Sequence, residues 1–214
     1  MILSLRIHCL KRRYGHKEAW KRFYRDIDVD RPVEKTTFTV IDTETTGLSP
    51  KRDHLVSIGA VKVEKSLSVD ISTAFHRFLK VNRLSREAVE VHGITLRDLT
   101  DLGEEPREVI DDFMEYAVGT VVVGFNVEFD RRFIEKYLRS IYGIPFPFYR
   151  VDVLTLLRRK GVRAGSLESV ARTMGVPALG VHSAVDDAYT TALLFLKLVT
   201  PLRREPLKVL PLVL

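Results

Sequence analysis

The pattern of apolar and polar positions predicts a group of strands in the first half of the chain. Residues 38–41 (FTVI) are apolar or β-branched, and the segments 55–64 and 68–79 alternate between apolar and polar positions. The turn-rich stretch TTGLSPKRD (45–53) separates the first strand from the second. Because the connections are short, the three strands are expected to form an antiparallel meander.

Helix and strand patterns alternate in the second half of the chain. Residues 105–117 have helical spacing, 120–125 (TVVVGF) read as a short buried strand, and 127–143 return to helical spacing before Gly143. A fifth strand is predicted at 146–152, and three further helical patterns follow at 153–161, 166–175 and 183–199. A meander followed by β-α-β units predicts an α/β fold, in which helices flank a mixed five-stranded sheet.

Both ends of the chain differ from this central pattern. An amphipathic helix is predicted across 17–25, with Trp20, Phe23 and Tyr24 packing on the body. The polar segment 28–37 resembles a linker. We therefore expect three parts: a basic N-terminal arm and linker (1–35), a main domain (36–200) and an apolar tail (201–214). The proline-rich tail is expected to pack back on the body, with a docking peptide for a partner as the alternative.

Composition favours a soluble protein without a membrane span. The chain has 214 residues, of which 45% are hydrophobic and 29% charged. A single cysteine, Cys9, excludes an intramolecular disulfide and a cysteine cluster for zinc, so we expect a reducing compartment, the cytoplasm. Residues 1–13 begin with an apolar run, but Arg6 and His8 interrupt it, which argues against a signal peptide.

The positive charge is concentrated in the arm. The formal net charge is +6, and residues 1–37 contain ten Lys or Arg against five Asp or Glu. Such an arm can attract phosphates without regard to sequence. The alternative is a solvated basic face of a helix.

Two carboxylates, Asp42 and Glu44, stand at the end of the first predicted strand. Side chains two positions apart on a strand lie on the same face, so these two acids are expected to lie side by side and to repel each other. A bound cation would relieve the repulsion. The alternative is a pair of surface acids at a strand end.

Acidic residues also stand at the start of two predicted helices. Asp130 is one, and its charge also suits the positive end of the helix dipole. Ser183 is predicted to cap the last helix, with Asp186 completing a capping box and Asp187 in the first turn. This cap does not explain His182, whose imidazole can accept a proton near neutral pH.

The four candidate ligands, Asp42, Glu44, Asp130 and Asp187, offer only oxygen atoms. Such ligands suit Mg²⁺ or Mn²⁺ and do not suit zinc. Two such ions about 4 Å apart can act on both the attacking and the leaving oxygen of one phosphorus. The chemistry that fits is phosphodiester hydrolysis.

Three motifs, DTETTGL (42–48), FNVEFD (125–130) and HSAVDD (182–187), give the sequence a resemblance to a known family. In order and in spacing they resemble the DnaQ-like, or DEDDh, 3′→5′ exonucleases, a family that includes proofreading subunits of bacterial replicative DNA polymerase. The resemblance covers about residues 36–198. It implies an RNase H-like fold and two divalent cations, Mg²⁺ or Mn²⁺.

The resemblance also implies roles for individual residues. Asp42, Glu44, Asp130 and Asp187 would hold the two cations, with Asp42 bridging them, and His182 would be the general base. The residues that would contact the terminal nucleotide are Thr45, Gly47, Leu48, Glu87, His92, Asn126 and Phe129. Leu48 would wedge against the base, whereas Phe129 has a core position as its alternative. Asp152 is expected to be structural.

One residue departs from the family pattern. The second motif commonly has histidine before its asparagine, and here Phe125 stands in that place. Metal binding is not expected to depend on this position, because Asp130 is present.

The function implied is release of nucleoside monophosphates from the 3′ end of DNA, in proofreading or repair. Nucleic acid is the expected partner, DNA before RNA. A DNA polymerase subunit is a further candidate partner, and no membrane is expected. The alternatives are a 3′→5′ exoribonuclease and a non-catalytic nucleic-acid-binding module of a polymerase complex. Loops around residues 80–105 are expected to set the preference for single or double strands.

Overall fold

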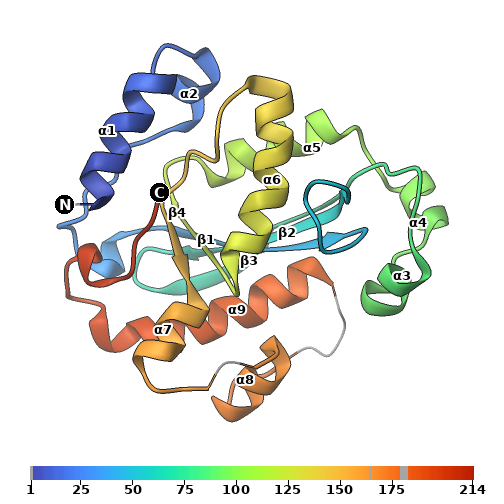
Figure 1. Cartoon of the computed structure of the whole chain (residues 1–214). Coiled ribbons are helices and arrows are strands. Elements are labelled where there is room, and N and C mark those ends of the chain that lie inside the picture. Colours follow the sequence, from blue (N-terminus) through green and yellow to red (C-terminus); the bar gives the residue numbers. More distant parts are fainter. Residues whose placement is uncertain (1, 164, 179–182) are drawn as a thin grey trace.

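The fold is built on one five-stranded sheet (Figure 1). The structure is a computed structural model that describes residues 2–163, 165–178 and 183–214. The strands are β1 (Phe38–Thr45), β2 (Leu55–Glu64), β3 (Ser68–Phe78), β4 (Val121–Gly124) and β5 (Arg150–Asp152), in the order β3-β2-β1-β4-β5. β1 to β3 pair antiparallel, and β4 and β5 run parallel to β1. The predicted meander followed by β-α-β units is confirmed.

Burial explains which segments form the centre of the sheet. All four residues of β4 are buried, as expected for a short apolar strand that is covered on both faces. β2 is likewise buried along nearly its whole length. β3, in contrast, lies at an edge, and most of its residues between Ser68 and Ala74 are exposed. β5 is shorter than the predicted strand at 146–152.

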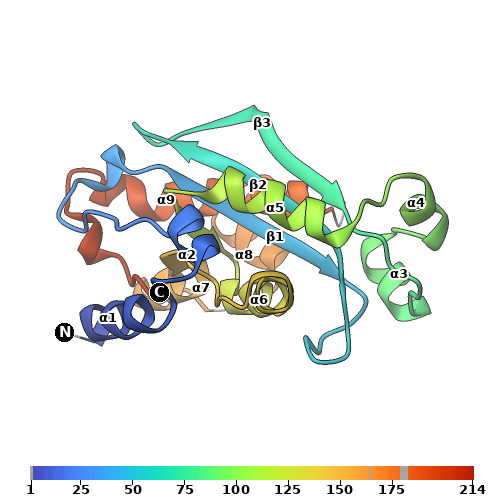
Figure 2. The ribbon, with the colours of Figure 1, turned by 90° about the horizontal axis from the view of Figure 1, so that it is seen from above.

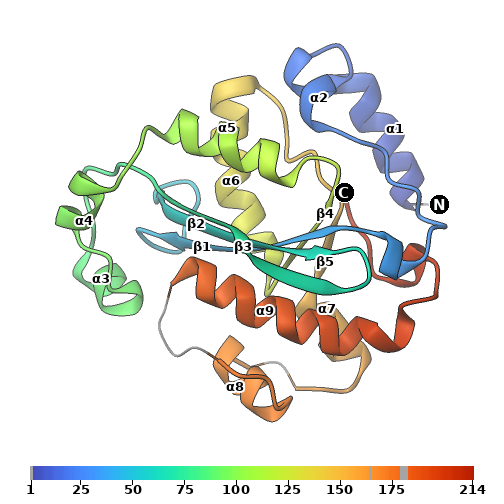
Figure 3. The same ribbon diagram turned by 180° about the vertical axis from the view of Figure 1, so that it is seen from behind.

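Helices cover both faces of the sheet (Figures 2 and 3). α5 (Pro106–Ala117) and α6 (Val127–Tyr142) pack on one face, and α9 (Ala184–Val199) packs on the other. Two shorter helices, α7 (Val153–Arg159) and α8 (Leu167–Thr173), pack against α9. α6 ends at Gly143, whose φ of 63° suits the left-handed C-cap position.

The N-terminal arm forms two helices, α1 (Ile2–Tyr14) and α2 (Glu18–Phe23). Trp20, Phe23 and Tyr24 are buried in the hydrophobic core, so their predicted packing on the body is confirmed. α1 was not predicted. Its apolar residues Leu3, Ile7, Leu10 and Tyr14 recur at helical spacing and pack against the core, and this packing stabilises the helix.

The C-terminal tail packs back on the body, as expected. After two 3₁₀ turns, Thr200–Leu202 and Leu207–Val209, the chain reaches the outer edge of β5. There Arg150 and Val213 exchange two backbone hydrogen bonds, of 2.7 and 3.0 Å. Leu210 and Leu214 are buried. The tail therefore covers an edge that would otherwise expose unpaired backbone groups.

The region 80–105 is not simply a loop, because it contains two short helices. α3 (Arg86–His92) begins at Ser85, whose side chain accepts a hydrogen bond from a backbone N–H, and it ends at Gly93. α4 (Leu96–Asp101) begins with a complete capping box from Thr95. Each helix spans fewer than two full turns, which is too short for helical periodicity to stand out in the sequence.

Among the described residues, none of the helices combines the length and the apolar character that crossing a membrane requires.

Candidate active site

The end of β1 positions the first two acids. Asp42 and Glu44 are separated by one residue of a regular strand, and an irregularity in the pairing with β2 follows directly after Glu44. Glu44 is buried and Asp42 is partly exposed. Regular strand geometry therefore places both carboxylates on one face, as predicted from the sequence.

The neighbouring strand lets the last helix approach this face. Gly59 of β2 pairs with Asp42, and a Cβ at Gly59 would lie 2.1 Å from the carbonyl carbon of Ala184 and 2.2 Å from the nitrogen of Val185. The first turn of α9 thus rests directly on the strand backbone, and only glycine permits this contact. Sequence analysis missed Gly59, although a lone glycine within a strand pattern is a known sign of close backbone approach.

The contact at Gly59 brings Asp187 to the acids of β1. Asp42, Glu44 and Asp187 each offer a carboxylate oxygen, and these oxygens all lie within 4.8 Å of one another. The three residues come from β1 and from the first turn of α9, which are separated by more than a hundred residues in the sequence. This distance is short enough for one cation to bind oxygen atoms from all three.

Asp130 lies in the first turn of α6 and is 3% exposed. Its Oδ1 accepts a hydrogen bond of 2.7 Å from the Thr43 hydroxyl, which belongs to the residue between the two acids of β1. The charge of Asp130 also raises the pKa of Asp42, so the two carboxylates interact through space. Thr43 is a second residue that sequence analysis missed, because its partner depends on the tertiary structure.

Burial and mutual repulsion make these acids hard to ionise. The pKa of Asp42 is raised well above its ordinary value by burial and by the charges of Asp130, Glu44 and Asp187. The pKa of Glu44 rises to about 7 through burial and repulsion by Asp187 and Asp130. Burial also raises the pKa of Asp130 to about 7, although the hydrogen bond from Thr43 opposes this rise.

The donor set fits a hard divalent cation. In the part of the chain that the structure describes, no lysine or arginine forms an ion pair with Asp42, Glu44 or Asp130. A group of carboxylates without a cationic side chain gains most from a bound ion, because the ion offsets both the desolvation and the repulsion. Oxygen ligands of this kind suit Mg²⁺ or Mn²⁺.

The predicted general base, His182, lies outside the described residues. Ser183 occupies the N-cap position of α9, and its carbonyl accepts a hydrogen bond of 2.9 Å from the N–H of Asp187. Its side chain, however, makes no capping hydrogen bond to any residue that the structure describes. The predicted capping box between Ser183 and Asp186 is therefore wrong.

The predicted contacts of the first motif follow β1 directly. The Thr45 hydroxyl donates a hydrogen bond of 2.7 Å to the carbonyl of Gly47, which shapes the turn after the strand. Leu48 is 84% exposed, an unusual position for a leucine. A partner that covers Leu48 would remove this apolar surface from water, which fits the predicted contact with a base.

A pocket of about 330 Å³ lies between α3, α4, β3 and the start of α9. Its lining includes two histidines, His76 and His92, together with apolar side chains and Ser183. Nδ1 of His92 accepts a hydrogen bond from the N–H of Ile94, and its buried Nε2 has no partner among the described residues. His92 is thus suited to donate a hydrogen bond to a molecule in this pocket. Glu87, in contrast, is exposed on α3 and does not line it.

The residues of the second motif divide into structural and exposed groups. Asn126 is exposed and has left-handed backbone angles at the N-cap of α6. Its N–H and that of Leu154 both donate to Oδ1 of Asp152, so Asp152 has the structural role expected for it. Phe125 and Phe129 are partly buried against the core, and the ring of Phe129 packs on that of Phe133, with 5.0 Å between the ring centroids.

Comparison with known proteins gives this site a context. The profile of the RNase_T exonuclease family matches residues 39–195. The chain is 32% identical over 182 residues to the PolC-type DNA polymerase III of Thermotoga petrophila, over 84% of this chain and 13% of that protein. It is 32% identical over 170 residues to the DNA polymerase III epsilon subunit of Aquifex aeolicus, over 78% of this chain and 82% of that protein.

A solved structure shows the same fold. Exonuclease I of E. coli, in complex with a dA16 oligonucleotide, superposes with a TM-score of 0.62 at 22% sequence identity, over 78% of this chain and 41% of that one. The family match spans all the strands of the sheet and includes the acids of β1, α6 and α9. This chain therefore belongs to the RNase_T exonuclease family.

Proposed function

We propose that this protein is a metal-dependent 3′→5′ exonuclease that removes nucleoside monophosphates from the 3′ end of DNA. The observation that supports this most strongly is the group formed by Asp42, Glu44 and Asp187, whose carboxylate oxygens lie within 4.8 Å of one another. Membership of an exonuclease family supports hydrolysis of phosphodiester bonds as the reaction. The carboxylate ligands, which offer only oxygen atoms, support a divalent cation as the cofactor.

In this proposal Asp42, Glu44, Asp130 and Asp187 hold two Mg²⁺ or Mn²⁺ ions. Bound there, the ions would neutralise charge that develops on the phosphoryl oxygens and on the leaving oxygen. Burial and the charges of Asp130, Glu44 and Asp187 all raise the pKa of Asp42, so Asp42 would gain from positive charge beside it and is proposed as the ligand that the two ions would share. Thr43 orients Asp130 through its hydroxyl, so that one carboxylate oxygen of Asp130 is held in place.

His182 is proposed as the general base. It precedes α9 by two residues, and α9 supplies Asp187 from its first turn. His182 takes a proton from the attacking water while the new oxygen–phosphorus bond forms. The bond from phosphorus to the 3′-oxygen of the preceding nucleotide then breaks, and that oxygen takes a proton from solvent.

The exposed Leu48 and the pocket beside His92 are proposed to hold the terminal nucleotide, together with Thr45, Gly47 and Asn126. Leu48 offers an apolar contact to a base, and Nε2 of His92 offers a hydrogen-bond donor. DNA is proposed as the substrate, because the two polymerase III relatives carry the names of DNA polymerases. The same names favour a role in proofreading together with a polymerase subunit.

The first experiment mixes the purified protein with 5′-labelled single-stranded DNA and RNA of the same sequence, with Mg²⁺, Mn²⁺ or EDTA. A ladder that shortens from the 3′ end, only with metal and faster on DNA, is expected. Faster shortening of RNA would transfer the proposal to RNA processing. Absence of shortening on both substrates would refute nuclease activity of the isolated chain.

Matched variants separate the site from general effects. Asp42→Asn should abolish shortening, whereas Asp28→Asn, an exposed acid far from the site in sequence, should leave it unchanged. His182→Ala should lower the rate by ~10² to 10⁴ without loss of Mn²⁺ affinity, and the exposed His16→Ala serves as its control. Loss of Mn²⁺ binding in His182→Ala would contradict its role as base.

A further inference from the structure

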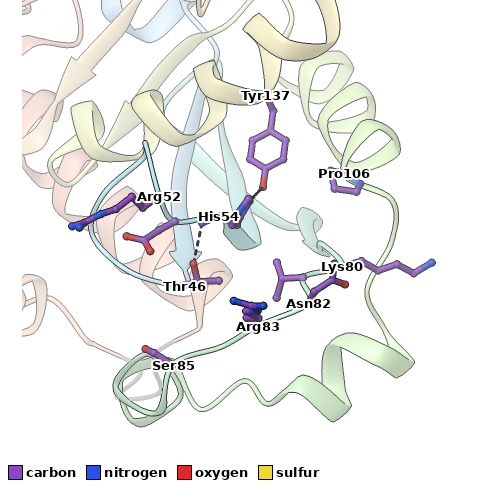
Figure 4. Close-up of a pocket in the computed structure, with 11 residues that line it drawn as sticks. Thr46, Arg52, His54, Lys80, Asn82, Arg83, Ser85, Pro106 and Tyr137 are labelled. Atoms are coloured by element: carbon purple, nitrogen blue, oxygen red, sulfur yellow. Dashed lines mark hydrogen bonds between the residues drawn. The ribbon is translucent and has the colours of Figure 1, made fainter.

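A second pocket, of about 550 Å³, lies beside the loop that follows β1 (Figure 4). Four segments form it: the β1–β2 loop, residues 80–85 before α3, Pro106 at the start of α5, and the middle of α6. The lining residues used below are Thr46, Arg52, His54, Lys80, Arg83 and Tyr137. The proposed catalytic group contributes none of them.

Cations surround the mouth of this pocket. In Figure 4, Arg52 and Lys80 lie on opposite sides of the pocket with their charged ends directed outward, and Arg83 lies between them. Arg52 and Arg83 are exposed and form no ion pair with any described residue. Lys80 contacts Glu105 at 3.1 Å, but both side chains are more than half exposed, so this pair competes weakly with another anion.

The single carboxylate in the pocket is already engaged. Asp53 accepts a hydrogen bond of 2.7 Å from the N–H of Ser49 and stabilises the turn of the β1–β2 loop. Arg52, Lys80 and Arg83 together carry three positive charges against the one negative charge of Asp53, so the described lining keeps a net positive charge. Such a surface attracts a polyanion.

Hydrogen bonds hold the wall of the pocket in place. The N–H of Thr46 donates to the carbonyl of His54, and the N–H of His54 donates to the Thr46 hydroxyl, at 2.9 and 3.0 Å. Lys136 of α6 also donates to the carbonyl of Asp53, at 2.7 Å. The rings of His54 and Tyr137 point toward each other, with 3.5 Å between Nδ1 and the hydroxyl. A wall fixed in this way loses little conformational entropy when a ligand binds.

The pocket begins close to the proposed catalytic group. Thr46 follows Glu44 by two residues, a separation of roughly 7 Å along an extended chain. A nucleic-acid strand whose 3′ end lies at the acids therefore reaches the pocket within a few nucleotides.

We propose that this pocket binds backbone phosphates of the substrate strand on the 5′ side of the scissile bond. The inference rests on the proposed exonuclease function and adds a binding site that the catalytic residues do not provide. Arg52 and Arg83 supply the charge, and the ring of Tyr137 supplies an aromatic surface for a base. An acidic peptide is the competing ligand, and the short distance to the carboxylates favours the nucleic acid.

The test compares a substrate that is too small to reach the pocket with one that is long enough to reach it. The p-nitrophenyl ester of thymidine 5′-monophosphate reaches only the catalytic group, whereas a single-stranded oligonucleotide reaches both sites. The variant is Arg52→Gln with Arg83→Gln. The control is Lys65→Gln with Arg204→Gln, which removes the same charge from exposed positions that do not line this pocket. The pocket variant should raise KM for the oligonucleotide about 10-fold and leave hydrolysis of the ester unchanged.

Binding measured without turnover keeps the two proposals separate. When the pocket substitutions are added to the Asp42→Asn protein, it should bind the oligonucleotide about 10-fold more weakly. The slope of the logarithm of the binding constant against the logarithm of salt concentration should become shallower by ~1.4, because two phosphate contacts on a single strand are lost. The control pair should change neither value. Unchanged oligonucleotide binding by the pocket variant would overturn the inference. Polyglutamate serves as the probe for an acidic peptide, and a pocket variant that loses only polyglutamate binding would also overturn it. A wild-type protein that cleaves neither substrate would refute the exonuclease function, and the binding assay would still decide the role of the pocket.

Discussion

Replacing Glu44 by glutamine should stabilise the metal-free protein at pH 8. Glu44 is 9% exposed, and burial together with the charges of Asp187 and Asp130 raises its pKa from 4.5 to about 7. In the unfolded chain the same carboxyl returns to its ordinary pKa. A raised folded-state pKa means that the folded protein binds the proton more tightly than the unfolded chain, so the ionised form of Glu44 opposes folding.

The magnitude follows from the size of this shift. The shift of about 2.5 pKa units corresponds to about 3 kcal/mol, which is expressed fully above pH 7. At pH 5 the folded carboxyl is protonated and the unfolded one is only partly ionised, so the penalty falls to about 1 kcal/mol. Stability conferred by the protonated Glu44 is thus present at low pH and lost as the pH rises from about 4.5 through 7.

The assay is urea unfolding in EDTA at pH 5 and pH 8, followed by circular dichroism. Glu44→Gln should exceed the wild type in free energy of unfolding by up to about 3 kcal/mol at pH 8 and by about 1 kcal/mol at pH 5. The matched control is Glu108→Gln, an exposed position on α5, which should change the free energy by less than about 0.5 kcal/mol at both pH values.

Adding Mg²⁺ or Mn²⁺ should reverse the order at pH 8, because the wild type binds the ion more tightly than the variant and gains more from mass action. A Glu44→Gln protein that is less stable than the wild type at pH 8 in EDTA would refute the reasoning. An equal gain at pH 5 and pH 8 would also refute it, since repulsion between ionised groups must depend on pH.

Three further substitutions test the supports of the site. Gly59→Ala should destabilise the fold by about 2 kcal/mol or more and abolish activity, because its Cβ would displace the start of α9. The control in thermal unfolding is Gly165→Ala, whose Cβ would meet the Ser169 hydroxyl at 3.5 Å, the nearest atom among the described residues. Leu210→Ala should cost about 2–3 kcal/mol in urea unfolding if the tail stabilises the body. Thr43→Val should weaken Mn²⁺ binding about 10-fold by calorimetry, since Asp130 loses its hydrogen bond, and an unchanged affinity would contradict this role.

Local patterns were sufficient to predict much of the sheet and its covering helices. The segment 55–64, rich in apolar and β-branched residues, corresponds to β2, and the helical spacing in 127–143 corresponds to α6. The period is plain in α6 because only one face of that helix is buried. The short capped helices α3 and α4 were not predicted, since neither is long enough to show a period. α1 was not predicted either, although Leu3, Ile7, Leu10 and Tyr14, which pack against the core, recur at helical spacing in the sequence.

The same division applies to the candidate site. The acids and the shared face of Asp42 and Glu44 could be read from the sequence alone, because strand geometry is local. Only the tertiary structure decided that Asp187 joins them, since this depends on the close contact of α9 with Gly59 across more than a hundred residues of chain. The bond from Thr43 to Asp130 and the basic pocket beyond Thr46 were decided in the same way. Contacts between distant segments have no local periodicity, and they appear only once the chain has packed.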